Sequence, residues 1–566
     1  MSNNILPPKL KKLYEEKRFS DLILEIESTT SDDNRSAIVS NLLGVSRASI
    51  KGRTDRDVQY SLNDFESAFY KDNFGDISLD ALCNHIKVCI EVGKKESPLV
   101  RNFLKSEKMY DAANDKFSDN DKFLLHGIDM YKYLVNLKKK IAILEKMIEK
   151  NSLTKSIGIS YILAQMYLNN WTQKDFYKFS KDFSNLFKKH DSKKLDKINL
   201  LSNKKIKIGF LSPDYNKQHS ITYFLKDLIP KLSNQFTSYG LSLLEKKKHD
   251  DTTNIFQGLF DKWEDLGELS SQEIINKIQE LDIHILIDLA GIFSHNKIEI
   301  FNTRICPLQI NWLGFNNTTG LKEVDYIIAD KNTVKEEEKF YTEKVIKLPN
   351  IWNAHSGFNF KRSLRPLPAK KKGFITFGSF NNFMKLTDET IKNWIKILSK
   401  VKNSKLILKS SLYICEDSLI KKFEKEGLKD SIKILKKTKR VEFNEHLNMY
   451  KDIDICLDTY PYNGVTTTFE ALWMNVPVIT KKGYNFNSRC GESILINANL
   501  ENLIASSDED YFDKAVYFSN NLDELEKLRK NLFENVLDTP LFNTKNFSLN
   551  FSKKLLEIFK EKSAKL

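Results

Sequence analysis

Residues 453–473 read IDICLDTYPYNGVTTTFEALW, and this stretch predicts the fold around it. The apolar run Ile453–Leu457 is typical of a buried strand, and Asn463-Gly464 predicts a turn. Hydroxyls at Thr466, Thr467 and Thr468 precede an apolar helix that we expect to begin at Phe469. The first N–H groups of a helix lack partners, and its dipole adds about half a positive charge there. The stretch therefore predicts a site for the phosphates of a nucleotide diphosphate.

The same alternation of short apolar strands and amphipathic helices extends outward from this stretch. Helices are expected at 220–232, 271–281, 387–400 and 547–560. The expected strands of a first group are Ile206–Ser212, His284–Leu289, Leu308–Leu313, Asp325–Ala329 and Val345–Leu348. Those of a second group are Phe374–Phe380, Lys405–Leu408, Ile432–Leu435, Ile453–Leu457 and Val476–Thr480. This pattern predicts an α/β fold with two parallel, doubly wound sheets, and ligands bind beyond the carboxyl ends of such strands.

Charged or proline-containing stretches at His190–Lys204 and Phe360–Gly373 are the expected linkers. They divide the chain into an all-α domain over residues 1–200, a first α/β half over 205–360 and a second half over 373–566, which ends in a helix. Two successive α/β halves predict a cleft between them.

The region 1–200 has helical periodicity and almost no strand signal, with helices expected at 132–148 and 157–168. Asn41–Gly44 and Phe65–Ala68 resemble positions of a tetratricopeptide helix pair, although their spacing does not fit that repeat. Two interpretations stay open for this domain. It provides a groove that binds proteins, or it serves packing and solubility.

Composition excludes several classes of protein. The 566 residues are 41% apolar and 29% charged, which argues against extensive disorder. The net charge of +14 fits acidic ligands, but no aromatic-interleaved basic motif points to nucleic acid. Six scattered cysteines form no Cys-x-x-Cys pair, and no His/Cys/Asp cluster has the spacing of a metal site. Without a signal peptide or a run of about 18 apolar residues, we expect a cytoplasmic protein.

Four further side chains are candidates for chemistry, each with a simpler alternative. Lys385 precedes a helix that Thr387 caps. At this position its ammonium either neutralises a departing diphosphate or is one more surface lysine. Glu470 binds ribose hydroxyls or complements a helix dipole. His219 follows the first strand and acts as a base or hydrogen-bond donor, or is structural. His446 stacks on a planar base or caps its helix.

Taken in order, several blocks of residues 205–559 resemble the O-GlcNAc transferase-like family, glycosyltransferase family 41. The blocks are KIGFLSPDYNKQHS, DIHILIDLAGIFSHN, RICPLQINWLGFNNTTG, FGSFNNFMK, DICLDTYPYNGVTTTFEALWMNVPVIT and DTPLFNTKNF. The resemblance implies a GT-B architecture, with two Rossmann-like domains facing a cleft, preceded by an all-α, TPR-like domain. It implies inverting, metal-independent transfer of one sugar, GlcNAc or another hexose, to Ser/Thr side chains of proteins. The donor would be a UDP-sugar such as UDP-GlcNAc or UDP-glucose, with no other cofactor.

The resemblance also implies roles for individual residues. Lys385 would stabilise the diphosphate leaving group, and His219 matches an active-site histidine. The implied donor-binding residues are Asn382, His446, Asn463, Gly464, Thr466, Thr467 and Glu470. Two departures leave the donor open, because Val465 stands where the family pattern has His and Glu470 replaces Asp. UDP-GlcNAc, UDP-glucose and GDP-fucose are all used in this superfamily.

Other functions stay open on the sequence. An N-glucosyltransferase acting on Asn, or a GT-B transferase with a non-protein acceptor, would use the same fold. A nucleotide-binding, TPR-like scaffold without activity is the alternative of another class. The retention of Lys385, both threonines and Glu470 argues against that scaffold.

Overall fold

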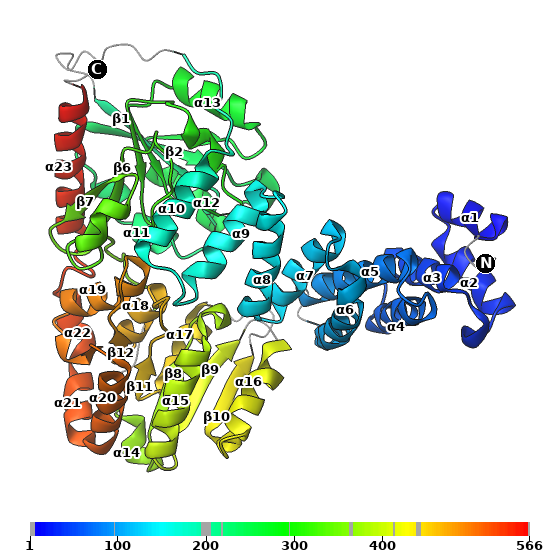
Figure 1. The fold of residues 1–566 in the computed structure, drawn as a ribbon. Coiled ribbons are helices and arrows are strands. Elements are labelled where there is room, and N and C mark those ends of the chain that lie inside the picture. The colour runs from blue at the N-terminus through cyan, green and yellow to red at the C-terminus, as the bar shows by residue number, and fades with distance from the viewer. Residues whose placement is uncertain are drawn as a thin grey trace. The chain divides into compact units, whose positions relative to one another are not determined.

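The computed structural model describes residues 6–94, 97–193, 205–216, 219–293, 295–360, 366–410, 414–436 and 443–563. They form two compact units (Figure 1). The first comprises Met1–Leu153 together with Ser410–Gly427 and Ile434–Arg440. The second comprises Thr154–Lys409, Leu428–Lys433 and Val441–Leu566.

The first unit is helical. Its helices are α1 (Pro8–Glu15), α2 (Phe19–Thr29), α3 (Ala37–Ser49), α4 (Asp55–Lys71), α5 (Asp76–Lys94), α6 (Phe103–Phe117), α7 (Asp121–Tyr133), α8 (Leu137–Glu149) and α16 (Ile414–Glu424). Helices α3 and α4 approach closely at Gly44, where an added Cβ would lie 2.6 Å from the Phe65 ring. This contact explains why Gly44 and Phe65 resemble paired positions of a helical repeat.

The single helix expected at 132–148 is wrong, because α7 and α8 are separate helices. Val135 adopts a positive φ of 54°, which a continuous right-handed helix cannot contain. Asn136 then caps α8 by accepting a hydrogen bond from the Lys139 N–H. The helix expected at 157–168 is confirmed as α9 (Lys155–Met166).

The first sheet of the second unit has seven described strands in the order β3-β2-β1-β4-β5-β6-β7, all parallel. They are β1 (Ile206–Ser212), β2 (Phe236–Ser242), β3 (Lys262–Asp265), β4 (Ile285–Asp288), β5 (Leu308–Asn311), β6 (Tyr326–Asp330) and β7 (Lys344–Leu348). The five strands predicted for this region are confirmed. The pattern missed β2 and β3, because their sequences FTSYGLS and KWED lack the apolar run that marks a central parallel strand.

The second sheet has six described strands in the order β10-β9-β8-β11-β12-β13. They are β8 (Thr376–Ser379), β9 (Lys405–Ser410), β10 (Ile432–Lys436), β11 (Ile455–Leu457), β12 (Val478–Lys481) and β13 (Ile504–Ala505). The five predicted strands are confirmed here too, and the two-residue β13 is too short to give a sequence signal. The fold is therefore α/β with two Rossmann-like sheets that follow a helical region.

The helices predicted for the second unit are confirmed, except that the one expected at 220–232 is wrong and α18 (Thr466–Trp473) begins earlier than expected. Predicted helices correspond to α13 (Ser271–Glu280), α15 (Asp388–Lys400) and α23 (Thr544–Ser563). The other helices are α10 (Gln173–Ser184), α12 (Asp251–Leu259), α14 (Pro368–Lys372), α17 (Phe443–Asn448), α19 (Cys490–Asn497), α20 (Asp508–Asn520), α21 (Leu522–Lys530) and α22 (Leu532–Leu537). No described helix is long and apolar enough to cross a membrane.

The helix expected at 220–232 is wrong. Only α11 (Thr222–Leu225) is α-helical there, followed by a 3₁₀ turn at Ile229–Lys231. Pro230 lies within that turn, and a proline removes a backbone donor and clashes with the preceding helical turn. The expected linkers at 190–204 and 360–373 fall partly outside the described residues, and the second includes the short helix α14.

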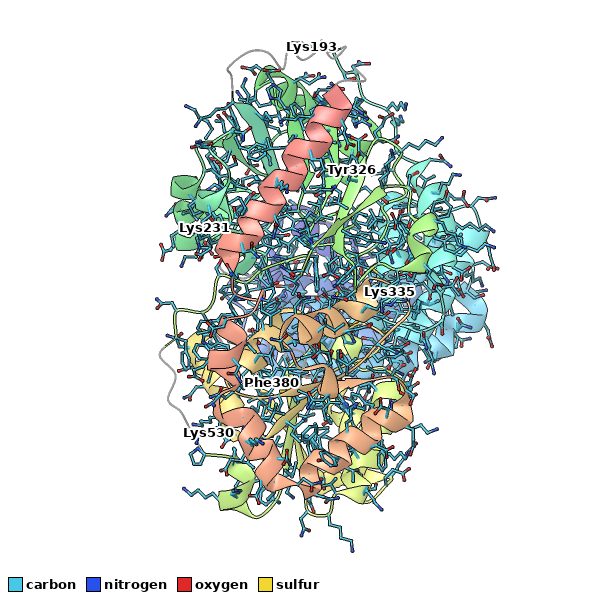
Figure 2. All side chains as sticks on the ribbon, turned by 90° about the vertical axis from the view of Figure 1, so that its left-hand side faces the viewer. Lys193, Lys231, Tyr326, Lys335, Phe380 and Lys530 are labelled. Carbon is cyan, nitrogen blue, oxygen red and sulfur yellow. The ribbon has the colours of Figure 1, made fainter. Side chains whose placement is uncertain are left out.

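The last helix, α23, returns to the first sheet and lies beside β6 and β7 (Figure 1). Its Phe551 ring lies 4.8 Å from that of Trp312, at the end of β5. Ser548 Oγ donates a hydrogen bond of 2.5 Å to the Lys231 carbonyl, and Figure 2 shows Lys231 near the beginning of this helix. The carboxyl end of the chain therefore ties the second half to the first.

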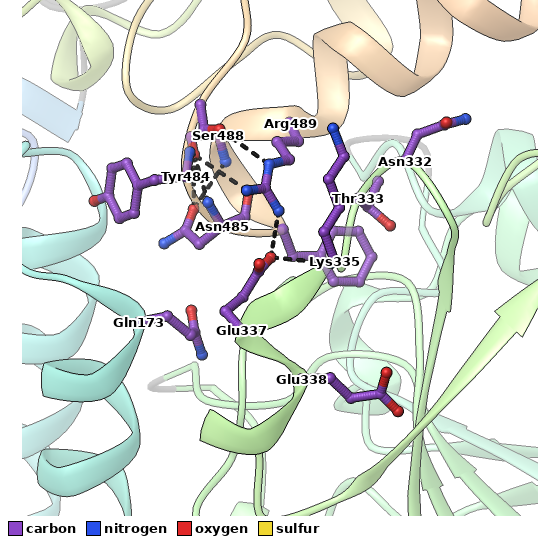
Figure 3. A network of polar contacts seen from close by, with 12 residues as sticks. Gln173, Asn332, Thr333, Lys335, Glu337, Glu338, Tyr484, Asn485, Ser488 and Arg489 are labelled. Atoms are coloured by element: carbon purple, nitrogen blue, oxygen red, sulfur yellow. Dashed lines mark hydrogen bonds and ion pairs between the residues drawn. The ribbon is translucent and has the colours of Figure 1, made fainter.

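A polar network also joins the two halves, at the carboxyl end of β6 (Figure 3). Arg489 pairs with Glu337, and Lys335 Nζ lies 2.8 Å from a carboxylate oxygen of Glu492 in α19. Arg489 also donates through Nε to the Gly483 carbonyl at 2.9 Å. These contacts hold α19 against the first half, and the first residues of α19 border the turn at Asn463.

Candidate active site

Helix α18 begins at Thr466, three residues earlier than the sequence pattern predicts. Its first turn therefore contains all three threonines. Val465 is the N-cap residue, and it makes no side-chain capping hydrogen bond. An apolar N-cap leaves the first N–H groups and the positive end of the helix dipole open to an anion. The start of α18 is thus a candidate phosphate site.

Asp458 organises the loop that leads into α18. Its carboxylate accepts hydrogen bonds from the N–H groups of Gly464 at 2.7 Å and Thr459 at 2.8 Å. The Thr480 hydroxyl, on β12, donates to its second oxygen at 2.7 Å. Burial raises the pKa of Asp458, and the Gly464 and Thr480 hydrogen bonds oppose that rise. Asp458 therefore fixes both ends of the turn and attaches it to the sheet.

Asn463 and Gly464 form the inner side of this turn, and both are buried. The Asn463 side chain points into the protein, donating to the Thr459 carbonyl at 2.9 Å and accepting from the Gly491 N–H at 3.2 Å. Its own carbonyl oxygen accepts a hydrogen bond of 2.8 Å from Lys385 Nζ. The turn thus binds the lysine through its backbone.

Lys385 lies in a 3₁₀ turn that connects β8 to α15. Besides Asn463, its ammonium lies 3.5 Å from Asn381 Oδ1 and 4.3 Å from the centre of the Tyr462 ring. Burial lowers the pKa of Lys385 to about 8. Among the described residues no carboxylate forms an ion pair with Lys385. The ammonium therefore stands next to the turn before α18 with its charge available to an anionic ligand.

The two neighbouring asparagines at the end of β8 have different surroundings. Asn382 is exposed, and its side chain accepts a hydrogen bond of 3.0 Å from the Met384 N–H. Asn381 is buried, accepts from the Thr467 hydroxyl at 3.0 Å and lies 3.4 Å from Asp458. The structure thus places Asn381 against the turn before α18. The doublet Asn381-Asn382 was the signal available in the sequence, and the pattern alone favours neither residue.

Glu470 and His446 meet at the other side of α18. His446 Nε2 lies 2.9 Å from Glu470 Oε2, which also accepts a hydrogen bond of 2.9 Å from the Tyr450 hydroxyl. Lys409 Nζ, at the end of β9, lies 2.6 Å from His446 Nδ1. Because an ammonium only donates, this contact places the imidazole proton on Nε2, facing the glutamate. Lys409 and Tyr450 were not predicted from the sequence.

His219 lies in the loop after β1, in the other half of the unit. Its Nε2 is 3.7 Å from one oxygen of Asp214, and His295 Nε2 is 3.2 Å from the other. Burial lowers the pKa of His219. His219 is therefore neutral near pH 7, the state that a proton acceptor needs. His295 was not singled out in the sequence, because nothing local connects it to the β1 loop.

Aromatic packing holds the His219 loop against α18. The ring of Phe224, in α11, lies 5.6 Å from that of Phe469. His355 stacks between Tyr223 at 5.4 Å and Phe469 at 5.1 Å. The two halves of the unit thus meet where the predicted site residues of each are found.

The structure brings together most of the predicted site residues in two groups on α18. Thr467, Asn463 and Gly464 adjoin Lys385, while Glu470 adjoins His446. Thr466 begins the helix at a half-buried position, and Asn382 faces solvent. Within the described ranges, no group of three or more His, Cys, Asp or Glu side chains could hold a metal ion.

We expect Gly464→Ala to weaken binding of a nucleoside diphosphate by about 10-fold, which is about 1.4 kcal/mol. An added Cβ would lie 2.5 Å from the Thr467 hydroxyl and 3.1 Å from Asp458, so the loop must shift. Calorimetric titration with UDP measures the change.

The matched control is Gly258→Ala in α12, where an added Cβ meets nothing within 4 Å. This control is expected to keep the affinity of the original chain. Equal affinities for the two variants would contradict a phosphate-binding role for the 464 turn.

A family model described as "Glycosyl transferase family 41" matches residues 128–359 and 360–551. Two similar plant proteins are named probable UDP-N-acetylglucosamine–peptide N-acetylglucosaminyltransferase SPINDLY. The one from Solanum lycopersicum is 31% identical over 418 residues, and the one from Arabidopsis thaliana is 30% identical over 426 residues.

These matches cover 70% and 72% of this chain but 43% and 45% of the plant proteins. The chain thus spans less than half the length of the curated relatives it matches. Among solved structures, a mutant O-GlcNAc transferase from Thermobaculum terrenum aligns with a TM-score of 0.76 and 22% identity, over 95% of this chain and 99% of that one. That likeness confirms the predicted GT-B fold with a preceding helical region. The family match covers well over half of the sequence, and this chain belongs to glycosyl transferase family 41.

Proposed function

We propose that this chain is a protein glycosyltransferase that moves one sugar from a UDP-sugar to Ser/Thr side chains, with inversion and without a metal ion. The observation that carries the proposal is the Lys385 ammonium, 2.8 Å from the Asn463 carbonyl, beside the uncapped start of α18. A helix N-terminus and an ammonium that forms no ion pair with the described residues together suit a diphosphate. Family membership supports sugar transfer as the reaction at that site.

The proposed reaction is a single displacement at the anomeric carbon. The acceptor oxygen attacks from the face opposite the diphosphate, so the new C–O bond forms as the bond to the phosphate oxygen breaks. The electron pair of the broken bond goes to that oxygen, where Lys385 and the N–H groups of α18 stabilise the new charge. Attack from the opposite face inverts the configuration of the sugar.

The proton of the acceptor hydroxyl needs a base on the acceptor side. We assign this role to His219, which is neutral near pH 7 and is held next to Asp214. The carboxylate stabilises the imidazolium that forms. The phosphates of the donor would bind Thr466 and Thr467, with Asn382 at the edge of the phosphate site.

Recognition of the nucleoside is assigned to the second group on α18. Glu470 would accept hydrogen bonds from the ribose hydroxyls, and His446 would stack on the base. Lys409 and Tyr450 hold these two side chains in a fixed arrangement at hydrogen-bond distances of 2.6–2.9 Å. Protein acceptors are supported by the names of the plant relatives, which are peptide N-acetylglucosaminyltransferases. The helical first unit would bind these acceptors.

A donor screen tests the proposal directly. The chain is heated with UDP, UDP-GlcNAc, UDP-glucose, GDP or GDP-fucose, and the unfolding midpoint is measured. A ligand that binds only the folded chain at 100 times its Kd adds about 2.7 kcal/mol of stability. We expect UDP and one UDP-sugar to raise the midpoint. No shift with any nucleotide would contradict the proposal and favour a scaffold without activity. A shift only with GDP or GDP-fucose would mean that the donor is a GDP-sugar and not a UDP-sugar.

Transfer itself is measured by the intact mass of candidate acceptor proteins, followed by mapping of the modified residue. Ser or Thr modification supports the proposal, whereas Asn modification would indicate N-glycosylation. We expect the rate to be unchanged by EDTA, because the proposed mechanism assigns neutralisation of the diphosphate charge to the Lys385 ammonium. A rate that falls with EDTA and recovers with Mg²⁺ would contradict the metal-independent mechanism.

A further inference from the structure

Tyr462 supplies an aromatic face to the Lys385 ammonium. Lys385 Nζ lies 4.3 Å from the centre of the Tyr462 ring, within the range of a cation–π interaction. The same ammonium donates to the carbonyl of the next residue, Asn463, at 2.8 Å. One short segment of the loop therefore holds the lysine from two directions.

The Tyr462 ring is itself held by an aromatic residue from a different part of the unit. Tyr167, directly after α9, stacks on it with ring centres 5.1 Å apart and planes inclined by 22°. Tyr462 also packs against the apolar core that α9 and α10 form with the first sheet. Within the loop, its carbonyl accepts a hydrogen bond of 2.7 Å from the Thr459 hydroxyl. The ring is thus held by its own loop and by the residue that follows α9.

We propose that Tyr462, stacked on Tyr167, is a positioning residue that holds the Lys385 ammonium at the place where the leaving diphosphate forms. The inference rests on the proposed function, because it concerns the lysine assigned to stabilise that leaving group. The two tyrosines act through Lys385. Tyr167 directly follows α9, and α9 packs on the first half. The position of the Lys385 ammonium therefore also depends on α9.

The aromatic face has a definite electrostatic consequence. An electron-rich ring beside an ammonium stabilises the charged form and raises the pKa of the lysine. Burial acts in the opposite direction and lowers the pKa of Lys385 to about 8, although Asp458 and Cys490, which also face the ammonium, raise it and are the same in every variant compared below. Without the ring, the charged form of Lys385 is less stable and the pKa of Lys385 falls further. The lysine then loses its proton at a lower pH.

Two substitutions at one position separate the ring from the hydroxyl. Tyr462→Phe keeps the aromatic face, and we expect kcat and its pH profile to match those of the original chain. Tyr462→Leu removes the face, and we expect kcat to fall by about 10-fold, equivalent to about 1.4 kcal/mol. In the leucine variant the decline of kcat at high pH should begin at lower pH, because the ammonium is the active form.

A second measurement needs no sugar transfer. Acetic anhydride modifies only the neutral amine, so the acetylation of Lys385 in the free protein, followed by peptide mass spectrometry across pH, reports its protonation. The midpoint should be lower in Tyr462→Leu than in Tyr462→Phe. Tyr167→Leu, which leaves both Lys385 and Tyr462 in place, should shift it in the same direction by a smaller amount.

The outcomes separate the inference from the proposed function. Equal kcat values and equal acetylation midpoints for Tyr462→Phe and Tyr462→Leu would overturn the positioning role. A lower unfolding midpoint in Tyr462→Leu with an unchanged acetylation midpoint would also overturn it, because the ring would then be structural only. If the original chain transfers no sugar from any donor, the proposed function fails, and the acetylation midpoints still decide whether Tyr462 holds the ammonium.

Discussion

Lys385→Ala is expected to lower the rate of sugar transfer by about 100–1000-fold without changing the unfolding midpoint. The loss equals that seen when one charged or hydrogen-bonding stabiliser of a developing anion is removed. Stability should be retained, because the ammonium donates to the Asn463 carbonyl and forms no ion pair among the described residues. Transfer is measured by intact mass under single-turnover conditions, and folding by thermal denaturation.

The matched control is Lys392→Ala, which removes an exposed lysine of α15. It should retain full activity. Lys385→Arg keeps a positive charge but replaces a compact ammonium with a planar fork, so we expect only partial recovery. A Lys385→Ala variant that keeps more than about a third of the original rate would contradict the role of Lys385 as the main stabiliser of the leaving group.

The same lysine predicts the pH dependence of the reaction. The protonated amine is the active form, and burial lowers the pKa of Lys385 to about 8. The rate should therefore be maintained below that pH and fall as the pH rises through it. Bound diphosphate favours the ammonium, so the fall should come at higher pH for kcat than for kcat/KM.

Asp458→Ala is expected to lower the free energy of unfolding by about 3–5 kcal/mol and to abolish nucleotide binding. Asp458 is 4% exposed and accepts hydrogen bonds from Gly464, Thr459 and Thr480. Alanine leaves these buried donors without partners and releases the turn that carries the Asn463 carbonyl. Urea denaturation measures the first effect, and calorimetric titration with UDP measures the second.

Asp523→Ala is the control for loss of a carboxylate. Asp523 pairs with Lys370 at 2.8 Å, but its side chain is 95% exposed, so water screens the pair and its loss should leave the stability unchanged. Asp458→Asn, which keeps one acceptor oxygen, should be intermediate in stability. Equal stability of the Asp458→Ala and Asp523→Ala variants would contradict the role of Asp458 as the anchor of the loop.

The regular elements could be predicted where the sequence pattern is strong. Strand β1 has the bounds predicted from IKIGFLS, and the α15 cap at Thr387 accepts the expected hydrogen bond from the Thr390 N–H. The sequence pattern failed to predict an element where the segment is only partly buried, or where one residue adopts backbone angles that its neighbours do not favour. Strand β3 is polar at the edge of its sheet, and Val135 breaks a helical pattern with a positive φ.

The start of α18 shows the same limit inside the candidate site. The glycine turn and the threonines predicted a phosphate site, but apolar periodicity placed the helix start at Phe469 instead of Thr466. Polar residues in a first helical turn carry no apolar signal, so the pattern begins late. The choice between Asn381 and Asn382 likewise depends on how β8 ends, which a doublet of identical residues cannot reveal.

The sequence by itself determined the alternation of strands and helices, the glycine turn before α18 and the family. These are properties of neighbouring residues, because periodicity and turn chemistry act over a few positions. Only the tertiary structure decided which side chains meet. His295 pairs with Asp214, Lys409 with His446 and Tyr167 with Tyr462 across long separations in the chain. Parallel strands place the loops at their carboxyl ends side by side whatever their distance in sequence, and that proximity creates the site.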